Sequence, residues 1–180
     1  MTELCLTLEE AKALPGLHMV FADNIRGIFS LGVKRKTHGN WGHYMWKTGR
    51  DRFASQWWYY RIDSLEHYTG CILKFVHNKN WTAAQEAMLT AAIETDIAKP
   101  WYKTLYDVPG VIGELLGIDR INIPGLDFCS ERGKYLRTVD PVFAEWLKKN
   151  PSPSPQQLND YTKAHQDLGY EVVGRYNAGD

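Results

Sequence analysis

The sequence has no run of 18 consecutive apolar residues, whereas a helix needs about 20 such residues to cross a bilayer. It begins Met1-Thr2-Glu3-Leu4-Cys5, with an early acidic residue and no long apolar core, which is not typical of a secretory signal. We therefore expect a chain with no transmembrane segment and a cytoplasmic location. Delivery to the cell envelope by another route stays open.

The chain also has no excess of either charge, because 21 Lys and Arg residues match 21 Asp and Glu residues. A neutral total provides no long-range field to attract nucleic acid or an anionic membrane. The one basic run, Lys34-Arg35-Lys36, is short and is typical of a solvated loop. We expect no nucleic-acid partner.

Cysteine is scarce: the chain has three, Cys5, Cys71 and Cys129. An odd number at wide spacing indicates neither a disulfide framework nor a zinc site. Free cysteines fit a reducing compartment. We expect no metal and no cofactor.

With 180 residues, 44% of them hydrophobic, the chain has the size of one domain that can bury a core. Patterning and capping signals predict a single α+β domain over 1–180, with a short N-terminal helix at about 7–14 and the core at about 15–175. The core is expected to be a small, mostly antiparallel sheet packed against helices. Strands are predicted at 17–21, 41–46, 53–62, 71–77 and 170–173, and helices at 82–98, 111–116, 129–137, from Pro141, and from Pro155 to about Leu168.

The most informative stretch is Gly125-Leu126-Asp127-Phe128-Cys129-Ser130-Glu131. Asp127 is a suitable N-cap, and Glu131 then falls in the first turn, where the helix dipole favours a negative charge. Cys129 would lie among backbone N–H groups that have no helical partner, a position that favours the nucleophilic thiolate. The alternative is that Cys129 is a small buried apolar residue, as most free cysteines are.

A cysteine nucleophile needs a base, and histidine has a suitable pKa. Of the six histidines, His43 lies in a predicted strand, Gly42-His43-Tyr44-Met45-Trp46, which would hold its ring more rigidly than a loop. The alternative is a half-buried histidine among aromatic residues. His38 falls in a predicted loop, and His67 and His165 are expected to face solvent.

The order of these elements resembles the circularly permuted NlpC/P60 hydrolases, papain-like cysteine enzymes in which the histidine strand precedes the cysteine helix. The resemblance covers roughly residues 15–175, and it rests on the order and spacing of short motifs. These are Met19-Val20-Phe21-Ala22-Asp23, Asn40-Trp41-Gly42-His43-Tyr44-Met45-Trp46, Leu105-Tyr106-Asp107 with Gly110 and Gly113, Phe128-Cys129-Ser130-Glu131, and Pro153-Ser154-Pro155 with the final strand.

The resemblance implies that Cys129 is the nucleophile and His43 the general base. A third family position, about a dozen residues after the histidine, orients the imidazole; here it falls on Ser55 or Gln56. Strand alternation allows only one of them to face the site, and we prefer Gln56 slightly for its longer reach and carbonyl acceptor. Tyr106 matches a family tyrosine that would bind the oxyanion together with the backbone N–H of Cys129. The alternative for Tyr106 is a core tyrosine.

Two departures from the family pattern stand out. The family usually has a strong polar group such as Glu or His at the third position, and a neutral group there would stabilise an imidazolium less. Arg132-Gly133 replaces apolar helix residues after the nucleophile, and Gly133 would cost an α-helix about 1 kcal/mol relative to Ala. That glycine is expected to mark close packing.

The function that the resemblance implies is cleavage of an amide bond through an acyl-enzyme, as in a cysteine peptidase or amidase. The substrate would be a small peptide, a cell-wall fragment or an acyl compound. Related enzymes include acyltransferases and lipid-directed thiol hydrolases, and a binding module with weak or absent catalysis is a further alternative. The aromatic run Trp57-Trp58-Tyr59-Tyr60 could line an acyl or glycan groove or belong to the core. Nothing in the sequence indicates an oligomeric state.

Overall fold

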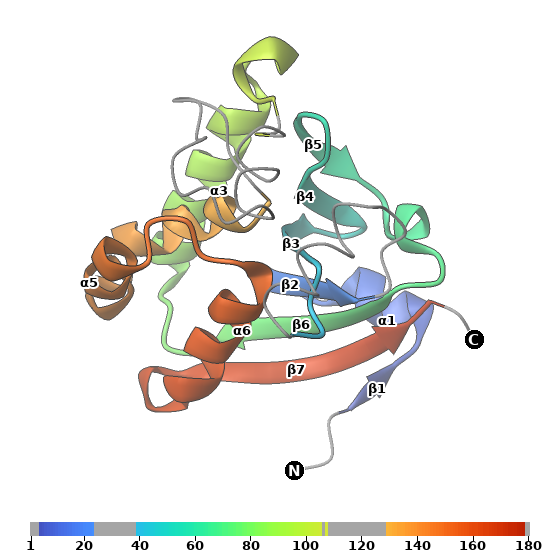
Figure 1. The fold of residues 1–180 in the computed structure, drawn as a ribbon. Helices are drawn as coiled ribbons and strands as arrows, with labels where there is room; N and C mark the ends of the chain where they lie inside the picture. The colour runs from blue at the N-terminus through green and yellow to red at the C-terminus, as the bar shows by residue number, and fades with distance from the viewer. Residues whose placement is uncertain (1–3, 24–38, 106, 108–128, 179–180) are drawn as a thin grey trace.

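The strands form one sheet in a computed structural model that describes residues 4–23, 39–105, 107 and 129–178. Seven strands lie in the order β1-β7-β6-β2-β3-β4-β5 (Figure 1). Five neighbouring pairs are antiparallel, and β1 and β7 are parallel, so the sheet is mixed. The strands are β1 (Cys5–Leu6), β2 (His18–Asp23), β3 (His43–Gly49), β4 (Arg52–Gln56), β5 (Tyr60–Asp63), β6 (Ile72–Asn78) and β7 (Tyr170–Asn177).

Helices begin where the sequence offers a side-chain cap. Thr7, Thr82 and Ser154 each form a capping box, in which the hydroxyl accepts from a backbone N–H and a Glu or Gln side chain accepts in return. Pro141 and Pro155 stand in the first turn of their helices, where a missing N–H costs nothing. The α-helices are α1 (Leu8–Ala13), α3 (Ala83–Ile97), α5 (Pro141–Lys149) and α6 (Pro155–Ala164), and the 3-10 helices are η1 (Leu65–Tyr68), η2 (Trp101–Lys103), η3 (Ser130–Thr138) and η4 (Gln166–Leu168).

Both faces of the sheet carry an apolar core. On the face that we call the helical face, Tyr44 and Trp46 of β3 pack with residues of α3, η3, α5 and α6, which gather on one side of the sheet in Figure 1. On the opposite face, Met45 packs with Ala11 of α1 and Leu65 of η1. Alternate residues of one strand therefore enter two different cores. The mixed sheet with helices packed on it confirms the predicted α+β class. Within the described ranges, no helix is both long and apolar enough to cross a membrane.

Some elements differ from the prediction. The run expected as one strand over 53–62 forms two, β4 and β5, because the chain turns at 57–59 and pairs with itself. In α3, the apolar residues at helical spacing, Ala84, Ala87, Met88, Ala91 and Ala92, are not the buried ones: Leu89 and Ile93 are. The helix from Pro155 ends at Ala164, not near Leu168, and the helix predicted at 111–116 lies outside the described residues.

Gly133 marks the close packing that the sequence predicts. A Cβ atom at this position would lie 2.9 Å from Cδ1 of Leu158, which is a buried residue of α6. Helix η3 can therefore approach α6 only without a side chain at Gly133. The helix is 3-10 along its nine residues rather than the expected α-helix.

We expect Gly133→Ala to lower the free energy of unfolding by about 1–2 kcal/mol, because the added methyl group overpacks against Leu158. Urea denaturation measures the change. In a Leu158→Ala background the same substitution should cost nothing, since the clash is gone. Gly49→Ala is the control, because its Cβ would lie at an ordinary 3.4 Å from Arg52 Cδ. An equal loss in both backgrounds would contradict the packing explanation.

Candidate functional site

His43 and Ser55 form a buried pair on the face of the sheet opposite the helical face. His43 is the first residue of β3 and is 4% exposed. Its Nε2 lies 2.8 Å from Oγ of Ser55, which is fully buried on β4. The register pairs Ser55 with Met45, so Ser55 is the diagonal neighbour of His43 across the two strands. The structure therefore brings together the predicted base and one of its two candidate orienting residues.

The buried position of His43 sets its charge. Burial, with a smaller contribution from the charge of nearby His67, lowers the pKa of His43 from 6.5 to about 3. The imidazole is therefore neutral at physiological pH, the form that accepts a proton. A general base works best with a pKa close to the working pH. His43 is therefore in the right protonation state but is a weak base.

Gln56 lies on the other face, because successive strand residues alternate. Its Nε2 donates to the carbonyl of Thr104 at 2.7 Å, and its Oε1 accepts from Nε of Arg132 at 3.0 Å. The first bond ties β4 to the end of η2, and the second ties it to helix η3. The preference for Gln56 as the residue that orients His43 is therefore corrected: Ser55 is the partner, and Gln56 supports the helix.

Cys129 directly precedes η3 and is 4% exposed. The helix is held on the helical face, where the carbonyl of Arg132 accepts from Nε1 of Trp46 at 3.0 Å. The ring of His43 is on the opposite face of β3 from the side chain of Trp46. Since His43 is the first residue of its strand, an encounter between Cys129 and His43 would have to occur around that end of β3.

The remaining predicted site residue is Tyr106. It lies outside the described residues, as does the predicted N-cap Asp127. The oxyanion role of Tyr106 therefore stays a prediction.

Two groups of residues, one on each face of the sheet, were not predicted. Arg132 is buried with its guanidinium 4.3 Å above the ring of Tyr60 and forms a 2.8 Å salt bridge with Asp96. Its position after Cys129 was noted as a departure, but nothing in the sequence indicated its partners. On the opposite face, the indole of Trp57 stacks on His43, with ring centroids 4.9 Å apart and planes at 26°. A strand-end aromatic two residues after Ser55 is the signal that could have indicated this contact.

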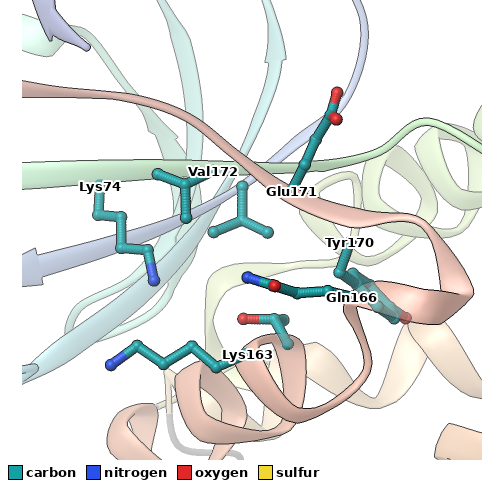
Figure 2. Close-up of a pocket in the computed structure, with 8 residues that line it drawn as sticks. Lys74, Lys163, Gln166, Tyr170, Glu171 and Val172 are labelled. Atoms are coloured by element: carbon teal, nitrogen blue, oxygen red, sulfur yellow. The ribbon is translucent and has the colours of Figure 1, made fainter. Parts of the chain in front are cut away.

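A separate hollow lies between β6, β7 and α6. Figure 2 shows Lys74 from β6 and Lys163 from α6 extending along it, with Tyr170 and Val172 on β7. Lys74 is fully buried, and its Nζ donates to Oδ1 of Asn159 and lies near the rings of Phe21 and Trp41. No predicted site residue lines this hollow, so we place the candidate site at His43.

In the part of the chain that the structure describes, no group of three or more His, Cys, Asp or Glu side chains could hold a metal ion. The features of the candidate site are thus the buried His43–Ser55 pair and the helix that follows Cys129. No protein-family model matches the chain, and no curated protein matches it significantly.

Proposed function

We propose that the protein is a cysteine hydrolase with a permuted papain-like fold, in which Cys129 is the nucleophile and His43 the general base. The observation that carries the proposal is the 2.8 Å contact between His43 and Ser55, 12 residues apart on adjacent strands. Ser55 stands at the position that the family resemblance assigns to the orienting group. The proposed substrate is an amide in a small peptide or cell-wall peptide.

In the proposed reaction, His43 removes the proton from the thiol of Cys129, and the thiolate attacks the amide carbonyl. The protonated imidazole then gives its proton to the leaving amine as the carbon–nitrogen bond breaks. Water, deprotonated by His43, hydrolyses the resulting thioester and releases the acid. The backbone N–H of Cys129 would donate to the oxyanion.

Alkylation of the cysteines by iodoacetamide tests this proposal, because the exposed Cys5 serves as an internal reference thiol. At pH 7 we expect Cys129 to react at least about tenfold faster than Cys5, since a paired base raises the thiolate fraction. His43→Ala should abolish the difference and leave the rate at Cys5 unchanged. Peptide mass spectrometry resolves the sites. If Cys129 reacts no faster than Cys5 in the wild-type protein, the proposal is wrong.

A binding module with weak or absent catalysis is the second candidate. The low pKa of His43 and the burial of both side chains favour it, because a weak base activates a thiol poorly. An acyltransferase or lipid-directed thiol hydrolase would use the same pair. An acyl-enzyme that is released by an added amine in preference to water would identify the transferase.

A further inference from the structure

Trp57 lies in contact with two aromatic rings of the candidate site. Its indole stacks on His43, with centroids 4.9 Å apart, and on Tyr68, with centroids 6.1 Å apart and planes at 28°. The stack fixes the plane of the imidazole, because rotation of His43 about its χ2 angle would collide with the indole. Whatever holds Trp57 therefore also holds the histidine.

Asp63 holds Trp57. Its Oδ2 accepts from Nε1 of Trp57 at 2.6 Å and from the hydroxyl of Tyr68 at 3.2 Å. Its Oδ1 accepts from Nε of Arg61 at 2.8 Å in a salt bridge. Asp63 is 8% exposed, and a carboxylate at this depth persists only when its oxygens are satisfied in this way.

Tyr68 belongs to the same arrangement through its hydrogen bond to Asp63. Burial raises the pKa of Tyr68 well above its usual range, and the nearby Asp63 carboxylate adds to this, while hydrogen bonding from Ser55 and Trp57 acts in the opposite direction. The neutral hydroxyl of Tyr68 has one proton, which it donates to Asp63. Trp57 and Tyr68 therefore donate to the same carboxylate oxygen of Asp63.

We propose that Asp63 is a positioning residue that fixes both the ring plane and the tautomer of His43. The held ring keeps Nε2 of His43 at 2.8 Å from Oγ of Ser55, and this contact favours one position of the imidazole proton. Nδ1 is the nitrogen left for the thiol. The inference that Nδ1 serves catalysis depends on the function proposed above for His43.

The tautomer is measured directly by ¹⁵N NMR at pH 7, with His43 assigned by comparison with His43→Gln. We expect one dominant tautomer in the wild-type protein, because the held ring keeps a single contact to Ser55, and a mixture in Asp63→Asn and in Tyr68→Phe. Tyr170→Phe is the matched control, because it removes another buried hydroxyl that donates to a carboxylate, Asp140, at 2.6 Å. It should leave the His43 signals unchanged. A mixture of tautomers in the wild-type protein, or an unchanged tautomer in both Asp63→Asn and Tyr68→Phe, would overturn the proposal.

Alkylation of Cys129 in the same variants separates this proposal from the proposed function. Loss of the outer partners of metal-ligating histidines typically lowers affinity or activity by ten- to a hundredfold, and by analogy we expect Asp63→Asn to slow Cys129 labelling about tenfold. A changed tautomer with slower labelling supports both proposals. A changed tautomer in a protein whose wild-type Cys129 reacts like Cys5 supports the role of Asp63 and overturns the hydrolase.

Discussion

Between pH 7 and pH 5 the free energy of unfolding is expected to fall by about 4 kcal/mol, through the titration of two buried histidines. His18 and His43 are 3% and 4% exposed. Burial, together with the charges of His77 and Lys47, lowers the pKa of His18 to about 4, and burial and His67 lower that of His43 to about 3. Below pH 6.5 the unfolded chain binds protons that the native protein excludes. The stabilising contribution of each histidine is therefore fully present above this pH, and the free energy of unfolding falls by about 1.4 kcal/mol per pH unit for each histidine as the pH drops.

Urea denaturation at pH 8, 7, 6 and 5 measures this dependence. His18→Gln and His43→Gln should each remove about half of the loss, about 2 kcal/mol, and the double variant should be nearly flat over this range. At pH 8 both histidines are neutral in both states, so each variant's stability there separates its packing cost from its proton linkage. A double variant that loses stability as steeply as the wild-type protein would contradict the assignment.

Replacement of Asp140 by Ala is expected to destabilise the protein by about 4 kcal/mol. Oδ1 of Asp140 caps α5 by accepting from the backbone N–H of Phe143 at 2.9 Å. Its Oδ2 accepts from the hydroxyls of Tyr161 at 2.9 Å and Tyr170 at 2.6 Å. The substitution removes a cap and leaves two buried hydroxyls without their acceptor, and each orphaned group costs about 1–3 kcal/mol.

Two further measurements separate the contribution of the helix cap from that of the two tyrosine hydroxyls. Ser154→Ala removes the N-cap of α6 but leaves no buried tyrosine hydroxyl without an acceptor, so it should cost only about 1 kcal/mol. In a Tyr161→Phe, Tyr170→Phe background, Asp140→Ala should cost about half as much as in the wild-type protein, because no hydroxyl is then left unpaired. Thermal and urea unfolding measure both. An equal cost in the two backgrounds would show that the cap alone matters.

The fold was most predictable where the signal is local. Thr82, Ser154 and Pro155 set helix starts through atoms within three residues, so the sequence alone predicts those helices. Strand β1 was not predicted, because its two residues are ordered by pairing with Arg175 and Tyr176 at the far end of the chain. In α3, alanines are spread over several faces of the helix, so the apolar pattern could not show which face packs on the sheet.

The candidate site was also predictable only where the signal is local. Alternation shows that Ser55 and Gln56 face opposite ways but not which one shares a face with His43. The position of η3 decides which residue faces His43, because Arg132 of η3 donates a hydrogen bond to Gln56 on the other face of the sheet. The contribution of Asp63 was not foreseeable, because it reaches His43 through the packing of Trp57, which no sequence spacing encodes.

The position of β7 between β6 and β1 has a consequence for synthesis on the ribosome. Strand β6 at 72–78 gains its second neighbour, and β1 at 5–6 its only one within the described residues, when residues 170–177 arrive. Nascent chains stalled before this point would carry an unpaired edge on β6, open to pairing with other nascent chains. Chains released before residue 170 should therefore need chaperones more than chains released after residue 177, in which β7 can pair.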